Sequence, residues 1–288
     1  MSTEYSGERF LPAECKGEME IEHFQRYQFA SNFVKDKVVL DAACGEGYGS
    51  NILAETAKQV YGLDLDEKTV LAAEKKYGSE KLKYVAGSIA KLPFEENTFD
   101  VIISFETIEH VDSDLQQSFL EEIERVLKPN GMLIMSTPNK AVYTDLVKGE
   151  NKFHIKEFYV QEYIDFLKQK FEKIELFCQY PSVGYYISKE NEIVKKENKP
   201  VRIEECRYVI AICANREISY QLDVKDYAYF EDSMYYFLNA NAHELEKQLI
   251  QTKEEGDVFA AQLEGSIKKQ QEYIQTLENE IVKHKEYE

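Results

Sequence analysis

Short apolar runs, separated by more polar stretches, recur between residues 38 and 136. The first run, Val38–Leu40, is rich in β-branched residues and has the length of a buried parallel strand. A helix is predicted after it, from Ser50 to Lys58. The other runs that we predict as strands are Val60–Leu65, Leu82–Ala86, Thr98–Ser104 and Met132–Ser136. Strands alternating with helices predict an α/β fold built on a mostly parallel sheet.

A glycine-rich turn follows the first of these strands. Asp41 ends the strand, and Gly45, Gly47 and Gly49 come next. Glycines at these positions permit a tight turn in which backbone N–H groups face a ligand. Their G-x-G-x-G spacing lacks the phosphate-binding G-x-G-x-x-G pattern of an NAD dehydrogenase. Asp64 ends the second strand, 19 residues after Gly45, where a carboxylate can accept hydrogen bonds from a ribose diol.

Six short motifs occur along the chain in the order and spacing of a known family. Together they resemble the class I S-adenosylmethionine-dependent methyltransferases of type 11, in the branch that includes the ubiquinone-type O-methyltransferases. The resemblance covers roughly residues 1–217. It implies S-adenosylmethionine as the cofactor and a Rossmann-like, seven-stranded, mostly parallel sheet with an antiparallel edge strand. The motifs are Leu40-Asp41-Ala42-Ala43-Cys44-Gly45-Glu46-Gly47, Gly62-Leu63-Asp64, Leu92-Pro93-Phe94, Phe99-Asp100-Val101, Glu109-His110-Val111 and Leu127-Lys128-Pro129-Asn130-Gly131.

The resemblance also implies where the cofactor binds. A helix predicted at Glu18–Phe33 would fold over the cofactor as a lid, with the Arg26 guanidinium on the methionine carboxylate. Ser88 stands where relatives often carry an Asp that accepts from the adenine amino group, so adenine recognition would depend more on the Ile89 backbone and on apolar contacts. The expected cofactor-binding residues are Arg26, Tyr27, Asp41, Ala43, Gly45, Gly47, Asp64, Leu65, Ser88, Ile89 and Phe105.

Glu106, Glu109 and His110 follow the fourth strand, at the carboxyl edge where open α/β sheets bind ligands. A helix that starts near Thr107 would place these three side chains on one face. Three interpretations compete. His110 is the general base, or the three residues bind a divalent cation as similar residues do in ubiquinone-type O-methyltransferases, or Glu106 and His110 only order the cofactor and the loop. We expect no metal, because the Glu-His-Val ending also occurs in relatives without one.

His154 is the second candidate for the chemistry. It lies just beyond the fifth strand, in a Phe-His-x-x-Glu-Phe segment that similar sequences share and that would hang over the acceptor. The alternative is an incidental histidine in a loop before a helix. The candidate catalytic residues are therefore His110, His154 and Glu106.

Four parts are predicted along the chain. Residues 1–37 form an N-terminal lid segment, 38–218 the methyltransferase core, and 219–239 a connector. Residues 240–288 lack proline and predict a coiled-coil helix that makes the protein a homo-oligomer, with a single helix packed on its own core as the alternative. The apolar seam consists of Leu263, Ile267, Ile274, Leu277 and Ile281.

Charge and composition limit the partners and the location that we expect for the protein. The formal net charge of −18 argues against nucleic acid as a partner, because its backbone requires a basic face. No apolar stretch is long enough for a transmembrane segment, and residues 1–10 do not form a signal peptide. The five cysteines lack metal-ligand spacing and are expected to be reduced thiols. These features predict a cytoplasmic protein.

The opening motifs suggest the acceptor. Gly7–Pro12 and Glu22–Tyr27 resemble methyltransferase domains of bacterial surface-polysaccharide biosynthesis proteins, which often continue through coiled coils into glycosyltransferase domains. This resemblance implies a sugar hydroxyl of a cell-surface glycan as acceptor, a place at the inner face of the membrane, and a glycosyltransferase as partner or fused domain. Two alternatives stay open: a small-molecule O- or N-methyltransferase, and a coiled-coil assembly module with an inactive methyltransferase fold.

Overall fold

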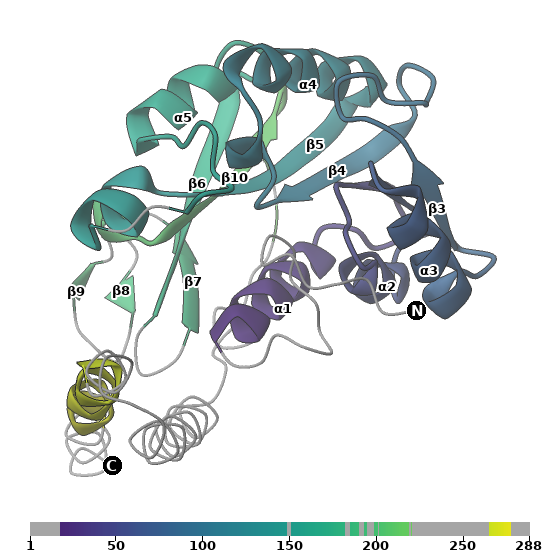
Figure 1. Ribbon diagram of the computed structural model, residues 1–288. Coiled ribbons are helices and arrows are strands. Elements are labelled where there is room, and N and C mark those ends of the chain that lie inside the picture. The colour runs from purple at the N-terminus through teal and green to yellow at the C-terminus, as the bar shows by residue number, and fades with distance from the viewer. Residues whose placement is uncertain are drawn as a thin grey trace. The chain divides into compact units, whose positions relative to one another are not determined.

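The computed structural model describes residues 18–148, 151–181, 185–189, 193–194, 199–200, 202–218, 220 and 265–277. The chain divides into two compact units, which are considered separately: residues 1–180 with 186–227, and residues 181–185 with 228–288. The elements, labelled in Figure 1, are α1 (Glu18–Ser31), β1 (Val38–Ala42), α2 (Tyr48–Ala54), β2 (Gln59–Asp64), α3 (Glu67–Tyr77), β3 (Leu82–Ala86), β4 (Phe99–Phe105), η1 (Ile108–His110), α4 (Ser113–Val126), β5 (Leu127–Pro138), η2 (Ala141–Leu146), α5 (Val160–Leu167), β6 (Lys173–Pro181), β7 (Tyr185–Lys189), β8 (Ile193–Val194), β9 (Lys199–Pro200), η3 (Ile203–Glu205) and β10 (Tyr208–Ala214).

The strands form a mixed sheet in the order β3-β2-β1-β4-β5-β10-β6-β7. Neighbours from β3 to β5 pair in parallel, and β10 pairs antiparallel with both β5 and β6. The predicted Rossmann-like α/β fold with an antiparallel strand is therefore confirmed. Two details differ, because the antiparallel strand lies inside the sheet and the described sheet has an eighth strand, β7.

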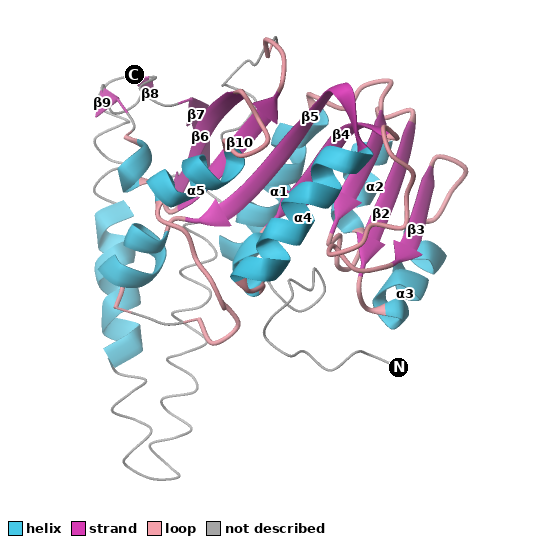
Figure 2. Cartoon of the chain, turned by 90° about the horizontal axis from the view of Figure 1, so that it is seen from above, coloured by secondary structure: helices cyan, strands magenta, loops and turns pink. Residues whose placement is uncertain are grey.

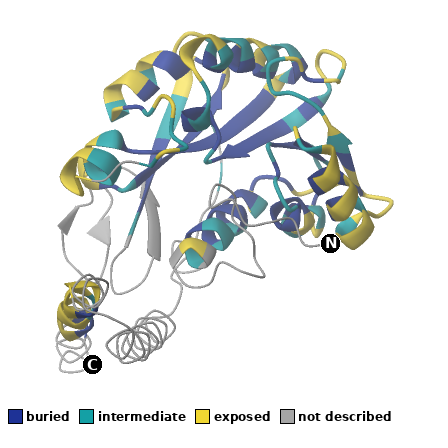
Figure 3. Ribbon diagram, viewed as in Figure 1, coloured by how far each residue is buried: buried dark blue, intermediate teal, exposed yellow. Residues whose placement is uncertain are grey.

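Helices cover both faces of this sheet, and each face has its own apolar core (Figure 2). Successive strand residues alternate between the two cores: Val39 lies in the core under α1, α2 and α3, whereas Leu40 lies in the core under α4 and α5. All seven residues of β10 are buried for the same reason (Figure 3), since Ile210 packs on one face and Val209 on the other. A strand covered on both faces is uniformly apolar, so its sequence marks an interior place in the sheet.

The start of α2 is packed tightly under the ring of Tyr27 from α1. A Cβ atom at Gly49 would lie 2.0 Å from the Tyr27 ring, so only glycine fits there. We expect Gly49→Ala to lower the free energy of unfolding by about 1–3 kcal/mol, because Tyr27 must move out of its packed position. Denaturant unfolding measures this loss. Asn51→Ala, on the exposed side of the same helix, is the control and should change stability by about 0.5 kcal/mol or less; equal effects of the two changes would contradict this packing.

One expectation about the cysteines is wrong. Cys178 on β6 and Cys206, just before β10, form a disulfide with their Cα atoms 5.4 Å apart. Antiparallel pairing of β6 with β10 brings the two residues together across the sheet. Among the described cysteines, Cys44 and Cys213 are free and buried, as expected. Cys15 lies outside the described residues.

The second unit contains a described helix over residues 265–277, within the predicted coiled-coil segment 240–288. Ile267, Ile274 and Leu277 are its buried apolar residues. Leu263, Ile281 and the connector 219–239, apart from Tyr220, lie outside the described residues. In the described parts of the chain, no helix has both the length and the apolar character needed to span a membrane.

Candidate active site

The predicted glycine turn joins β1 to α2 in a strained conformation. Ala43, Gly45 and Gly47 all have positive φ angles, of 64°, 52° and 78°. Glycine adopts such angles readily, whereas alanine does so at an energetic penalty. A Cβ atom at Gly47 would lie 2.6 Å from the Tyr84 ring, but at Gly45 it would meet nothing within 4 Å. The backbone at Gly45 therefore borders open space, as a ligand-binding turn requires.

Asp64 holds this turn against the end of β2. Its Oδ2 accepts a hydrogen bond from the Gly45 backbone N–H at 3.0 Å, and its Oδ1 accepts one from the Asp66 N–H at 3.0 Å. The residue is 6% exposed. Each carboxylate oxygen can accept more than one hydrogen bond, so hydroxyls of a ligand can bind to the same carboxylate. The neighbouring Leu65 is 73% exposed and gives the site an apolar border.

Asp41 is a buried carboxyl below the turn. The hydroxyls of Tyr27 and Ser50 donate to its two oxygens at 3.1 and 2.6 Å. Burial raises the pKa of Asp41 from 3.8 to about 7, although the two hydrogen bonds oppose that shift. Asp41 therefore ties Tyr27 of α1 to the start of α2, next to the glycine turn. Because Asp41 is completely buried, its role is to support the turn and not to contact a ligand.

Ionisation of Asp41 makes the free energy of unfolding depend on pH. The unfolded chain loses the Asp41 proton near pH 3.8, but the folded protein keeps it until about pH 7, so this group destabilises the fold progressively as the pH rises between these values. Asparagine cannot ionise. Relative to wild type, Asp41→Asn should gain up to about 4 kcal/mol in free energy of unfolding between about pH 4 and pH 8. Denaturant unfolding of both proteins at the two pH values is the test, and a pH-independent difference would contradict it.

Arg26 on α1 is buried with only part of its guanidinium satisfied. Its Nη1 donates to Gln179 Oε1 at 2.6 Å and lies 3.8 Å from Glu106 Oε1. The guanidinium also stacks over the Tyr208 ring, 4.8 Å from its centroid. Within the described structure, Nε and Nη2 have no hydrogen-bond partner. Two unsatisfied donors on a buried cation fit an anionic group such as a carboxylate.

Glu106 directly follows β4 and lies in the left-handed region, with a φ of 50°. Its side chain accepts from Ser136 Oγ at 2.7 Å and approaches Arg26. The predicted helical face of Glu106, Glu109 and His110 is therefore wrong, because the chain forms the short 3-10 turn η1 after a sharp bend. The Glu106 side chain therefore lies beside Arg26.

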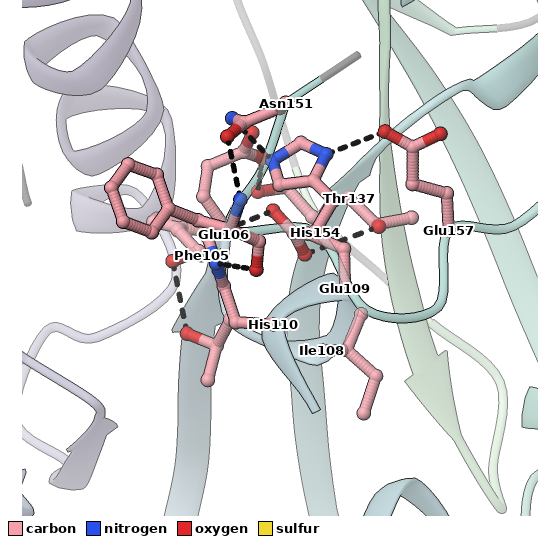
Figure 4. A network of polar contacts seen from close by, with 12 residues as sticks. Phe105, Glu106, Ile108, Glu109, His110, Thr137, Asn151, His154 and Glu157 are labelled. Atoms are coloured by element: carbon pink, nitrogen blue, oxygen red, sulfur yellow. Dashed lines mark hydrogen bonds and ion pairs between the residues drawn. The ribbon is translucent and has the colours of Figure 1, made fainter. Parts of the chain in front are cut away.

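Glu109 is fully buried behind this turn (Figure 4). Its Oε2 accepts from Thr137 Oγ1 at 3.3 Å, while Oε1 has no hydrogen-bond partner in the described structure. Burial, followed by the neighbouring charge of Glu106, raises the pKa of Glu109 well above its usual value. His110 Nε2 lies 3.9 Å from Glu109 Oε1.

His110 and His154 lie together although 44 positions separate them in the sequence. Their ring centroids are 5.0 Å apart, and the ring of His154 stacks on Tyr143 at 5.3 Å. His154 Nδ1 is 2.5 Å from Glu157 Oε1, and Thr144 donates to both oxygens of Glu157 at 2.8 and 2.7 Å. Figure 4 shows the two rings on the side of the site that also carries Glu109. The structure thus brings both predicted histidines to one place.

The remaining predicted cofactor residues lie on the two sides of the glycine turn. Phe105 packs edge-on against Tyr27, with centroids 5.2 Å apart. Ser88 Oγ accepts from the backbone N–H of Ala90 at 3.2 Å, in the turn that also contains Ile89. Among residues that we did not single out from the sequence, the structure adds Gln179, which holds Arg26, and Glu157, which holds His154. Glu157 lies within the Phe-His-x-x-Glu-Phe segment, whereas no sequence signal marks Gln179.

Comparison with known proteins agrees with this geometry. Residues 40–135 match the family model described as a methyltransferase domain. This stretch of the chain is therefore similar to a methyltransferase domain. The match includes the end of β1, the glycine turn, Asp64, η1 and most of β5. The predicted cofactor, S-adenosylmethionine, agrees with the descriptions of the similar proteins.

Curated relatives of the methyltransferase domain point to the same cofactor. A protein of Mycolicibacterium smegmatis, described as a probable S-adenosylmethionine-dependent methyltransferase, is 34% identical over 57% of this chain and 63% of its own length. A relative of the same description from Mycobacterium tuberculosis is 32% identical over 54% of this chain and 57% of its own length. The chain thus spans about 60% of the length of these relatives.

Solved structures share the fold of the methyltransferase domain. One is a S-adenosylmethionine-dependent methyltransferase from Thermotoga maritima, described as a possible histamine N-methyltransferase. It has a TM-score of 0.54 and 17% identity, covering 68% of this chain and 90% of that protein. A protein from Pyrococcus horikoshii has a TM-score of 0.51 and 20% identity, covering 70% of this chain and 92% of its own.

Proposed function

We propose that the protein transfers the methyl group of S-adenosylmethionine to a sugar hydroxyl of a bacterial cell-surface glycan. The observation that carries the assignment of the cofactor is the hydrogen bond from the Gly45 N–H to Asp64, at a turn where the Gly45 backbone borders open space. The proposal of a glycan as the acceptor is supported by the motifs near the start of the sequence. Gly7–Pro12 lies outside the described residues, so for that segment this support comes from sequence alone.

The described residues fit S-adenosylmethionine at three points. The Asp64 carboxylate would accept from both ribose hydroxyls, and its negative charge disfavours a phosphate there. The unsatisfied Nε and Nη2 of Arg26 would donate to the methionine carboxylate. The exposed Leu65 and the turn at Ser88 and Ile89 would border the adenine. These groups occur at the carboxyl ends of β1, β2 and β3 and on the lid helix α1.

The chemistry needs alignment and a proton acceptor. Bound S-adenosylmethionine supplies a methyl group on a cationic sulfur that leaves as a neutral thioether. The protein must hold the acceptor oxygen in line with that methyl group, and such positioning supplies a large part of the rate enhancement. His110 Nδ1 donates to the Phe153 carbonyl at 3.0 Å, so the neutral ring carries its lone pair on Nε2. A neutral His110 ring therefore presents the lone pair of Nε2, as a general base requires.

A small-molecule acceptor is the second candidate, and the relatives support it. A protein of Mycobacterium ulcerans described as a phthiotriol/phenolphthiotriol dimycocerosates methyltransferase is 31% identical over 47% of this chain and 48% of its own length. That description names phthiotriol and phenolphthiotriol dimycocerosates, not a glycan. The third candidate, an inactive assembly module, is disfavoured because the hydrogen bond between Asp64 and Gly45 is intact.

Methyl transfer from S-adenosylmethionine labelled with carbon-13 in its methyl group separates these candidates. The full chain is incubated with glycan fragments, a lipid alcohol, a quinol and an amine, and the products are examined by NMR and mass spectrometry. Label in a sugar O-methyl group is expected. Label only in the lipid alcohol, quinol or amine would favour the second candidate, and cofactor binding without any transfer would favour the third.

We further propose that residues 240–288 join copies of the chain and link the domain to glycosyltransferases at the inner face of the membrane. Support comes from the helix over 265–277, which buries Ile267, Ile274 and Leu277 at spacings of seven and three residues. Those three are buried within a single chain, so the contacts between copies would involve the rest of the seam.

Light scattering on the full chain and on a truncation after residue 239 tests this assembly. The full chain is expected to be at least a dimer and the truncated chain a monomer, because the apolar seam is removed. Monomers in both samples would contradict the oligomer. A circular dichroism spectrum of the truncated chain verifies that the methyltransferase domain is still folded.

A further inference from the structure

We propose that Glu109, His110 and His154 bind a divalent cation on the acceptor side of the site. The place of this cation in the reaction rests on the proposed methyl transfer, whereas its binding does not. This set differs from the one weighed from the sequence, because His154 replaces Glu106. It also revises our expectation that the site holds no metal.

Both histidines are oriented as metal ligands usually are. His110 Nδ1 must donate to the Phe153 carbonyl, since a carbonyl only accepts, and this places the lone pair of the neutral ring on Nε2. His154 Nδ1 lies against the Glu157 carboxylate, which Thr144 holds in place. Metal-binding histidines typically donate their second ring N–H to a carboxylate or a backbone carbonyl. Here His154 has the carboxylate partner, and His110 has the backbone carbonyl partner.

The protonation of His154 follows independently from Asn151. Asn151 Oδ1 accepts from the Phe153 backbone N–H at 3.1 Å, so its amide nitrogen is the atom that faces His154 Nε2 at 2.9 Å. An amide N–H can only donate, which means that His154 Nε2 carries a lone pair. A cation at this position would take that lone pair in place of the Asn151 amide.

Glu109 supplies the carboxyl ligand. It is fully buried, and its Oε1 has no hydrogen-bond partner in the described structure. An unsatisfied carboxylate oxygen in the interior is unfavourable unless a cation or a donor reaches it. Glu109 Oε1 lies 3.9 Å from His110 Nε2, too far for a hydrogen bond between them. Two ligand atoms of one ion, each at about 2.1 Å from it, are separated by up to about 4.2 Å.

The three donor atoms converge to nearly the spacing that one ion requires. One ligand atom from each of Glu109, His110 and His154 lies within 4.8 Å of the others, as the convergence in Figure 4 indicates. Small side-chain rotations would bring all three to bonding distance. Two imidazoles with one carboxylate favour Mn²⁺, Fe²⁺ or Zn²⁺ over Mg²⁺, which prefers oxygen ligands. Three protein ligands also leave positions open for a substrate oxygen.

The cation would change how the acceptor loses its proton. A hydroxyl bound at an open position becomes more acidic, as metal-bound water does. Its proton passes to solvent water, the oxygen forms the new bond to the methyl carbon, and the carbon–sulfur bond breaks with its electron pair retained by sulfur. In this arrangement the two histidines act as ligands, and Glu157 is a positioning residue that orients His154.

Binding of Mn²⁺ to the chelator-treated full chain, followed by electron paramagnetic resonance without cofactor or acceptor, tests the site. The wild-type protein should bind one Mn²⁺ per chain, and Zn²⁺ should displace it. Glu109→Gln and His154→Ala should each weaken Mn²⁺ binding by about 100-fold or more, and Glu157→Gln by about 10- to 100-fold. Glu121→Gln, which changes an exposed carboxylate on α4, is the matched control and should bind Mn²⁺ as the wild type does.

Two outcomes would overturn the cation site. One is that the wild type binds neither Mn²⁺ nor Zn²⁺, and the other is that the ligand variants bind Mn²⁺ as tightly as the control. Calorimetry with S-adenosylmethionine on the same proteins shows that each variant is folded. It also separates the two proposals, because a protein that binds the cofactor but no cation contradicts only the metal site.

Discussion

Replacing Asp64 by alanine is expected to weaken S-adenosylmethionine binding by about two orders of magnitude. The carboxylate would make two charge-assisted hydrogen bonds to the ribose, together worth roughly 3 kcal/mol. It also anchors the backbone of Gly45 and Asp66, so its removal loosens the turn that faces the cofactor. Isothermal titration calorimetry on the wild type and on Asp64→Ala measures the change in affinity directly.

Asp64→Asn is the matched variant for this prediction. Asparagine keeps the size of the side chain and one acceptor oxygen, so it should lose less affinity than alanine. A thermal unfolding curve for each variant shows whether the domain remains folded. A folded Asp64→Ala protein with wild-type affinity would show that the ribose is not bound at the end of β2.

The second large effect is expected at the two histidines. His110→Ala and His154→Ala should each lower kcat by about 10²- to 10⁴-fold, because each removes either a proton acceptor or a ligand for the acceptor-activating ion. The dissociation constant for S-adenosylmethionine should change by about twofold or less, since neither ring contacts Asp64 or Arg26 in the described interactions. His154→Ala should give the cleaner separation of turnover from cofactor binding.

Steady-state kinetics with a labelled methyl group, combined with cofactor titrations, tests this separation. Glu157→Gln is the informative companion, because it leaves His154 in place but weakens the contact that orients it. It should lower kcat less than His154→Ala does. Full turnover in both histidine variants would exclude a direct role for either ring and leave alignment as the source of the rate.

The sequence was sufficient for the parts of the fold that local pattern determines. The strands from Val38 to Ser136 and the helix at Glu18 were predicted with ends within about five residues, because apolar runs and apolar faces are local features of the sequence. The interior place of β10 was not, although Tyr208–Ala214 is uniformly apolar and therefore typical of a central strand. The disulfide was missed because it depends on which strands are neighbours.

The same distinction applies to the site. Asp64 and Gly45 were predicted together because their spacing reflects a recurring strand–turn–helix unit, and the structure joins them by a hydrogen bond. Arg26 was predicted from family resemblance, but its contact with Gln179 links positions 153 residues apart that no local pattern relates. The orientation of Glu106 depends on a single left-handed residue, which a helical pattern could not show.

Transfer of a labelled methyl group is the most direct test of the central claim, that this site binds S-adenosylmethionine and methylates an oxygen of its acceptor. The full chain is incubated with S-adenosylmethionine carrying a carbon-13 methyl group and with glycan fragments, and the product is analysed by NMR. A labelled methyl resonance is expected at the chemical shift of an O-methyl sugar, and it should be much weaker with Asp64→Ala at a cofactor concentration near the wild-type dissociation constant. Cofactor binding to the wild type with no labelled methyl group on an oxygen of any acceptor, or with the labelled methyl group only on nitrogen or carbon, would contradict it.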